Sequence, residues 1–120
     1  MSEVYDLYQE GLARLRAGLA AQATVPLERA RRAEPDKASI REALGRAYLT
    51  LRRYEEAEEE FSAMLELAPN DHYAYYCIGR CQEGTGRMLL AQGSYKMASW
   101  LLPGNGDYER ALSRVMQRTA

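Results

Sequence analysis

The sequence predicts an all-α protein made of three antiparallel helix pairs and one final helix. Three prolines, Pro35, Pro69 and Pro103, follow one another at intervals of 34 residues. Other residue types recur at the same interval, in columns made of Gly11, Gly45 and Gly79, of Ala23, Ala57 and Ala91, and of Leu27, Phe61 and Tyr95. A fixed period of this length is typical of repeat proteins. β-branched residues are too few to favour strands.

Each repeating unit is expected to contain two helices. Its glycine and its alanine are 12 residues apart, and these small side chains let two antiparallel helices approach closely. The proline then ends the second helix, because it has no N–H group to continue the hydrogen-bond ladder. The period divides a single domain, residues 1–120, into repeats at about 4–37, 38–71 and 72–105, followed by a capping helix at about 107–118.

Polar residues near the prolines predict where helices begin. Asp36, Asp71 and Asp107 are expected N-caps, because a carboxylate accepts hydrogen bonds from the free N–H groups of a first helical turn. Pro26 falls inside the second helix of the first unit. We therefore expect that helix to begin late, with Thr24 as its N-cap, or to bend in its first turn.

Composition and charge exclude several classes of protein. With 47% hydrophobic and 28% charged residues, the chain is neither disordered nor a disulfide scaffold. A net charge of −1 lacks the dense positive field of nucleic-acid-binding proteins and the polybasic run of membrane-surface proteins. No apolar segment approaches the length of a membrane span, the first residues do not resemble a signal peptide, and reduced cysteines fit the spacing of Cys77 and Cys81. These features predict a cytoplasmic location.

The middle unit carries the clearest motif. Residues 44–71 read LGRAYLTLRRYEEAEEEFSAMLELAPND, and the order and spacing of Leu-Gly, Tyr, Tyr, Ala, Phe and Pro resemble those of the tetratricopeptide repeat family. The third unit keeps this pattern with Gln82 and Met88 in place of two tyrosines, and the first unit departs from it most. The resemblance implies a right-handed α-solenoid that acts as an adaptor or scaffold and binds another protein.

In such a solenoid the first helices of the repeats line a concave groove. The register places ten candidate peptide-binding residues there: Tyr5, Tyr8, Leu12, Glu42, Arg46, Leu49, Tyr73, Tyr76, Arg80 and Glu83. Tyrosine and arginine dominate the energetics of protein interfaces, and the arginines favour an acidic or carboxylate-bearing segment. Glu42 and Glu83 lie within helical reach of Arg46 and Arg80, so pairing within the surface is the alternative.

One specific version of peptide binding is excluded. Co-chaperones of this family grip a carboxylate with lysines and asparagines, whereas the matching positions here hold Leu12, Ala43, Tyr73 and Cys77. The resemblance therefore does not extend to that activity.

No motif in the chain predicts catalysis or a bound cofactor. His72 is the only histidine and is expected to be an exposed polar residue beside a helix cap. Cys77 and Cys81 supply only two of the four ligands of a structural zinc site, so we expect them to pack in the core. The acidic run at residues 55–60 is expected to be a solvated outer surface, and Gly-Thr-Gly at 84–86 has no preceding strand to make it a phosphate loop. Neither an enzymatic activity nor a cofactor, metal or nucleic-acid partner is predicted.

Self-association is the alternative function. The chain would then be a structural module that forms a homo-oligomer through the surfaces of its terminal repeats. The candidates for a partly exposed apolar surface are Trp100, Leu101, Leu102, Val115 and Met116. Coverage of these residues by the final helix is the competing interpretation.

Overall fold

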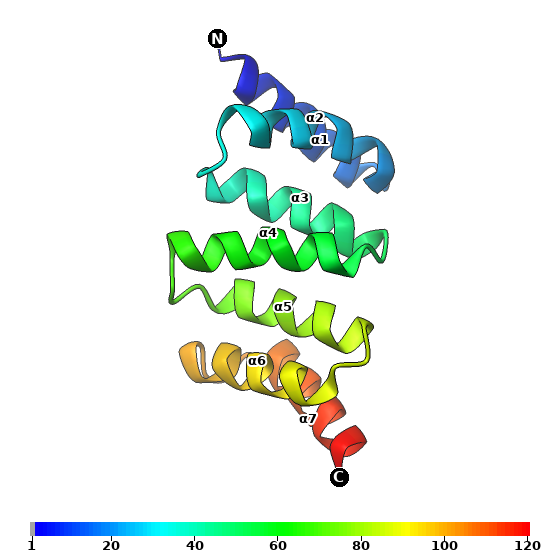
Figure 1. The fold of residues 1–120 in the computed structure, drawn as a ribbon, viewed down its shortest axis with the longest axis vertical. Coiled ribbons are helices and arrows are strands. Elements are labelled where there is room, and N and C mark those ends of the chain that lie inside the picture. The colour runs from blue at the N-terminus through cyan, green and yellow to red at the C-terminus, as the bar shows by residue number, and fades with distance from the viewer. Residues whose placement is uncertain (1) are drawn as a thin grey trace.

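The structure is a computed structural model, and it describes residues 2–120. These residues form seven helices joined by short turns. They are α1 (Glu3–Arg16), α2 (Ala20–Ala33), α3 (Ala38–Thr50), α4 (Tyr54–Leu67), α5 (His72–Gly84), α6 (Met88–Leu101) and α7 (Gly106–Thr119). Residues 2–120 contain no strand, so the all-α prediction is confirmed (Figure 1). The pairs α1–α2, α3–α4 and α5–α6 correspond to the three predicted repeats, whose boundaries stay a prediction.

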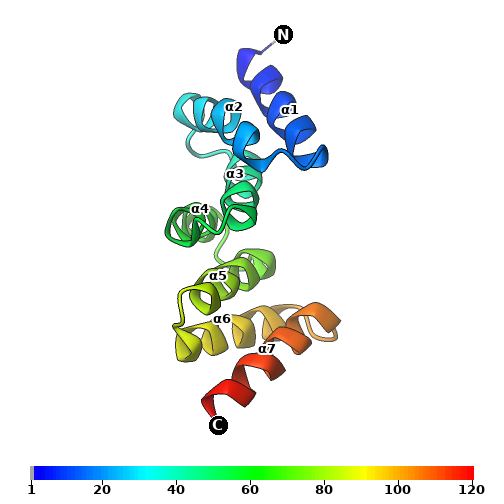
Figure 2. The same cartoon turned by 90° about the vertical axis from the view of Figure 1, so that its right-hand side faces the viewer.

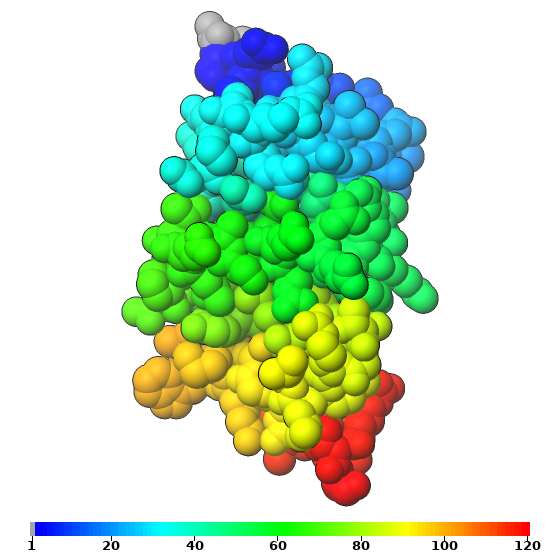
Figure 3. Space-filling model, in the orientation of Figure 1, coloured from blue at the N-terminus to red at the C-terminus, as the bar shows by residue number. Residues whose placement is uncertain are grey.

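The helices form an elongated stack in chain order. Each helix packs chiefly against the helices that precede and follow it, and the molecule measures 51 × 25 × 22 Å. Figure 1 shows the helices following one another down the long axis, and in Figure 2 α1 and α3 lie to one side of α2 and α4. In the space-filling view of Figure 3, successive segments appear as bands across the molecule. This arrangement is the helical-repeat solenoid that the 34-residue period predicts.

Recurring glycines let the two helices of a pair touch. A Cβ atom placed on Gly45 of α3 would lie 2.7 Å from Cζ of Phe61 in α4. The same atom on Gly79 of α5 would lie 2.5 Å from Cε1 of Tyr95 in α6. Both aromatic rings are fully buried. The glycine column therefore exists because a bulky side chain of the following helix fills the space beside each glycine backbone.

The helix caps agree only in part with the predicted ones. Asp71 caps α5, and its carboxylate accepts a hydrogen bond from the Ala74 N–H at 3.0 Å. The prediction is wrong for Asp36, because α3 begins at residue 38 and Lys37 precedes it without a side-chain cap. It is also wrong for Asp107, which lies inside the first turn of α7, where its charge suits the positive end of the helix dipole. Asn105 is the N-cap of that helix.

Pro26 lies within an unbroken α2. The expected late start is wrong, since the helix begins at residue 20 and Thr24 is not its N-cap. The Thr24 hydroxyl instead donates a hydrogen bond to the Ala21 carbonyl at 2.8 Å. Pro26 removes one backbone hydrogen bond, the one to the carbonyl of Gln22. Gln22 is exposed, so water can replace that bond and the helix continues.

The hydrophobic core consists of two connected clusters. The larger one joins buried side chains of α2 to α5, among them Leu44 and Phe61. The smaller one joins Tyr95 of α6 with Val115 of α7. Tyr76 of α5 packs against both clusters. The apolar side of α6 that faces α7 is therefore covered, which is the role expected of a capping helix.

One residue of the acidic run is buried between helices. Glu60 of α4 is 2% exposed and accepts hydrogen bonds from Arg31 of α2 and from Arg41 of α3. The Arg41 Nη1 atom lies 3.1 Å from Glu60 Oε1. The expected solvated surface is therefore wrong for Glu60, because its position on α4 turns the side chain toward the preceding helix pair. These three residues join the first pair of helices to the second.

Candidate functional site

The ten predicted binding residues lie on α1, α3 and α5, and the side of these helices that carries them is called the groove face below. Tyr5, Arg46 and Arg80 are exposed. Six residues are half-buried: Tyr8, Leu12, Glu42, Tyr73, Tyr76 and Glu83. Leu49 is 8% exposed and belongs to the larger core cluster, so its main contribution is to packing.

Two of the predicted tyrosines, both on α1, line a cavity near the N-terminal ends of α1 and α3. Tyr5 and Tyr8 line a cavity of 310 Å³ together with Ser39. Lys37 and Glu34 line it from the turn between α2 and α3, with 3.9 Å between the Lys37 Nζ and Glu34 Oε2 atoms. The rest of the lining is made by Ser2, Val4 and Ile40. We call this space the aromatic cavity. It offers flat ring surfaces and aliphatic side chains, with polar and charged side chains beside them.

A second cavity lies at the opposite, C-terminal ends of α3 and α5. Its volume is 490 Å³, and it is lined by Leu49, Thr50, Arg52, Tyr54, Arg80, Glu83, Gly84, Arg114 and Arg118. We call it the arginine cavity. The structure thus separates the predicted site into an aromatic end, with Tyr5 and Tyr8, and a basic end, with Arg80 and Glu83.

Three arginines of this cavity were not among the predicted residues. Arg114 had a signal in the sequence, because it follows Arg46 and Arg80 at the same 34-residue interval on the first helix after the third repeat. Arg118 lies one helical turn beyond Arg114 on α7. Arg52, in the turn between α3 and α4, had no such signal, because the equivalent positions of the other two units hold Gly18 and Gly86.

Glu83 is bound within the protein. Arg114 donates two hydrogen bonds to its carboxylate, each at 2.8 Å, and the Tyr95 hydroxyl donates a third at 2.8 Å. The hydrogen bonds from Arg114, more than any other contact, lower the pKa of Glu83. Glu83 therefore stays ionised and positions Arg114 at the arginine cavity. It is less available to contact a bound peptide than the sequence predicts.

Arg46 and Arg80 have no ion pair with any carboxylate of residues 2–120. The expected alternative was pairing with Glu42 and Glu83 on the same helices. Glu83 turns instead toward α7, and Glu42 makes no salt bridge in the described chain. Two exposed guanidinium groups are thus available on the groove face of α3 and α5.

The tyrosines of α5 form a packed base for this surface. The Tyr73 ring meets Phe61 edge-on, with 6.3 Å between ring centroids, and burial raises the pKa of Tyr73. The Tyr76 ring lies 4.8 Å from the ring of Tyr108. Side chains held in this way offer contact area to a ligand at little further cost in conformational entropy.

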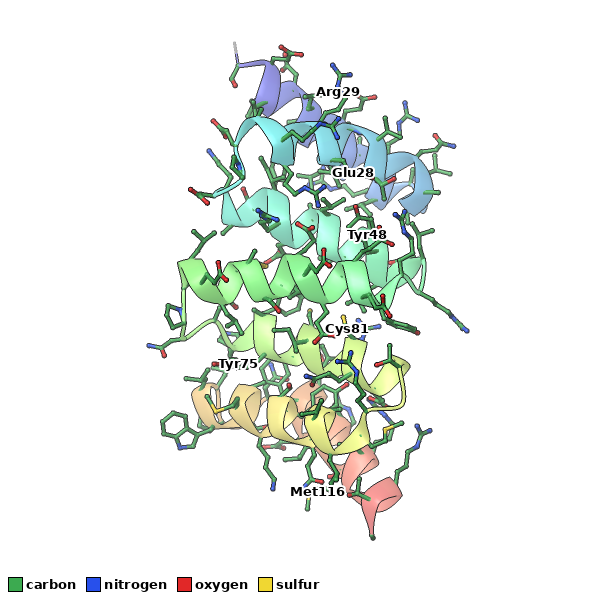
Figure 4. All side chains as sticks on the ribbon, viewed as in Figure 1. Glu28, Arg29, Tyr48, Tyr75, Cys81 and Met116 are labelled. Carbon is green, nitrogen blue, oxygen red and sulfur yellow. The ribbon has the colours of Figure 1, made fainter. Side chains whose placement is uncertain are left out.

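The residues considered for other chemistry have structural roles. Burial raises the pKa of the Cys77 and Cys81 thiols to about 12, so reactive thiolates are negligible at neutral pH. Figure 4 shows Cys81 between α4 and α5. The prediction that His72 is simply exposed is wrong, because it is half-buried and its Nδ1 atom is hydrogen-bonded to the Tyr108 hydroxyl at 2.7 Å. Within residues 2–120 no group of three or more His, Cys, Asp or Glu side chains is suited to a metal ion.

The apolar residues considered for self-association differ in exposure. Trp100 and Leu89 of α6 are 75% and 74% exposed. Met116 of α7, which Figure 4 labels, is 46% exposed. Val115 is fully buried against α6, so its predicted exposure is wrong. The apolar surface that remains open is thus carried mainly by α6.

None of the helices in residues 2–120 has the length and apolar character of a membrane span.

Comparison with known sequences identifies relatives. A family model described as tetratricopeptide repeat matches residues 8–72. Superkiller complex protein 3 of Mus musculus is 33% identical over 104 residues, and the protein of the same name from Homo sapiens is equally similar. The matched region is 87% of this chain and 6% of each relative, so the chain spans a small part of their length.

Solved structures share the whole fold. The first TPR of Spaghetti (RPAP3), bound to the HSP90 peptide SRMEEVD, has a TM-score of 0.91 and 19% identity over 98% of this chain and 93% of that one. MamA from Desulfovibrio magneticus RS-1 has a TM-score of 0.93 and 23% identity over 97% of this chain and 66% of that one. The family model covers more than half of the residues and the solenoid agrees with it. The chain belongs to the tetratricopeptide repeat family and is a protein-interaction module.

Proposed function

We propose that the chain is an adaptor or scaffold whose groove face binds an acidic or carboxylate-bearing segment of another protein. The observation that carries this proposal is the pair Arg46 and Arg80, which are exposed and free of carboxylate partners within residues 2–120. The free thiols of Cys77 and Cys81 support a cytoplasmic setting for the interaction.

The two ends of the groove face supply different contacts to such a segment. A carboxylate accepts two parallel hydrogen bonds from one guanidinium group, and such charge-assisted bonds are about twice as strong as neutral ones. Tyr5 and Tyr8 in the aromatic cavity would contact apolar side chains of the segment. A structural relative with an acidic peptide bound, the first TPR of Spaghetti (RPAP3) with SRMEEVD, supports this use of the fold.

The double substitution Arg46→Glu and Arg80→Glu is expected to weaken binding of an acidic peptide at least about a hundredfold, because attraction becomes repulsion at two positions. Peptides are first selected on the wild-type chain from a random displayed library. Their affinities for both proteins are then measured by isothermal titration calorimetry. Circular dichroism should show the same helix content and melting temperature for both, since Arg46 and Arg80 are exposed.

The matched control changes two exposed arginines of α2, Arg29→Glu and Arg32→Glu, which lie away from the groove face, and alters the net charge equally. It should retain wild-type affinity. Selection of neutral or basic peptides, or equal loss of binding in the control, would remove Arg46 and Arg80 from the centre of the proposed site.

Self-association is the second candidate, and the exposure of Leu89 and Trp100 on α6 favours it. If these residues form a contact between two copies, Leu89→Glu with Trp100→Glu should convert a dimer into a monomer in sedimentation velocity. Val25→Glu is the control, because Val25 is also exposed but lies on α2. A wild-type mass that stays monomeric across a wide concentration range would exclude this candidate.

A further inference from the structure

We propose that the arginine cavity is a binding site for a phosphoryl group carried on the acidic segment that the groove face binds. This inference rests on the proposed function and adds a chemical class of ligand to it. Three features carry it: the charge balance of the cavity, the free donors in it and the backbone of Arg52.

The charges that line the cavity favour a doubly negative group. Four arginines face it and Glu83 is the single carboxylate of its lining. The C-terminal ends of α3, α5 and α7 add roughly −0.5 elementary charge each. Roughly one to two positive charges therefore remain, which suits a phosphoryl group with about −1.5 to −2 charges at neutral pH.

Free hydrogen-bond donors come from three different elements. Arg52 in the α3–α4 turn and Arg80 on α5 have no carboxylate partner in the described chain. Arg118 on α7 lies 3.9 Å from Glu83 Oε2, which is too far for a hydrogen bond. A phosphoryl group has three oxygens that can accept from three guanidinium groups, whereas a planar carboxylate has two. Glu83 opposes an anion only weakly, since Arg114 and Tyr95 already donate to it.

The backbone of Arg52 is the independent observation. Its φ is +59°, and it is the one residue other than glycine with positive φ in residues 2–120. Gly18 and Gly86 occupy the equivalent turns with φ of +77° and +78°. Glycine adopts this conformation without the steric cost that arginine bears. The side chain of this strained arginine lines the arginine cavity, as expected if its guanidinium group binds a ligand.

The test compares two labelled peptides rich in glutamate, one with a central phosphoserine and one with serine at that position. Fluorescence anisotropy should give the phosphopeptide an affinity about tenfold or more higher for the wild-type chain. Inorganic phosphate should compete only at concentrations far above the Kd of the phosphopeptide, because phosphate lacks the contacts of the peptide with the groove face.

Arg52→Gly separates binding from folding. It should remove most of the preference for the phosphopeptide and raise the melting temperature by roughly 2–5 °C, because glycine relieves the positive φ. Arg118→Gln should also reduce the preference, with no such rise. Arg110→Gln, an exposed arginine of α7 outside the cavity lining, is the control and should keep it.

The outcomes distinguish the cavity from the groove face. Equal affinity of the wild-type chain for both peptides overturns the phosphoryl site, while loss of both peptides in the Arg46→Glu variant would still support the proposed function. Binding of the phosphopeptide alone, with sensitivity to Arg52→Gly, supports the cavity and contradicts binding of an acidic segment as such. A preference that survives both Arg52→Gly and Arg118→Gln also overturns the site.

Discussion

Replacing Arg31 and Arg41 together by methionine is expected to lower the free energy of unfolding by about 3–5 kcal/mol at neutral pH. Both arginines donate to Glu60, whose side chain is 2% exposed. Their removal leaves a carboxylate that is buried between helix pairs without a cation to stabilise its charge. Urea denaturation followed by far-ultraviolet circular dichroism measures the change.

The control for this prediction adds Glu60→Gln to the double variant. It should recover at least half of the lost stability, because no buried charge remains to be compensated. An exposed ion pair provides the second comparison, since Arg53→Met disrupts the contact with Glu56 and should cost less than about 1 kcal/mol. A cost below about 1 kcal/mol for the buried double variant as well would contradict the structural role given to Glu60.

Phe61→Ala is expected to lower the free energy of unfolding by about 3–5 kcal/mol, which is typical of the loss of a buried aromatic ring. The Phe61 ring is fully buried, packs beside the Gly45 backbone and meets the edge of Tyr73. Its loss opens a cavity at the junction of α3, α4 and α5. Chemical denaturation of the purified variant gives the value.

A coupling between Gly45 and Phe61 tests the geometry more sharply. Gly45→Ala alone should cost about 1–3 kcal/mol, because its Cβ atom would collide with the fully buried Phe61 ring. In a Phe61→Leu background the same substitution should cost much less, since the smaller side chain leaves room. Equal costs in the two backgrounds would mean that the two residues do not contact in solution.

The fold could be predicted because its contacts are local in sequence. In a solenoid each helix packs against its neighbours along the chain, so one 34-residue period carries both the helix pairs and their stacking. The prediction was wrong where a single position depends on a register shift of one or two residues. Asp36 lies just before the N-cap position of α3, and Asp107 just after that of α7.

The candidate site could be predicted at the level of a face. Helical periodicity places Arg46 and Arg80 on equivalent positions of α3 and α5, and both are exposed there. Periodicity does not report whether a charge finds a partner, because that depends on side chains of other helices. Glu83 pairs with Arg114, 31 residues away, and so leaves Arg80 free.

The sequence by itself determined the helical-repeat architecture, the family and the side of the helices that carries the exposed arginines, because all three follow from periodic local patterns. Only the tertiary structure decided that Glu60 is buried between Arg31 and Arg41, since that contact joins three helices. It also decided that Arg52 completes the arginine cavity, because a strained turn and the ends of three helices must come together there. Contacts that bring together residues far apart in the sequence leave no periodic signal, so the sequence pattern does not predict them.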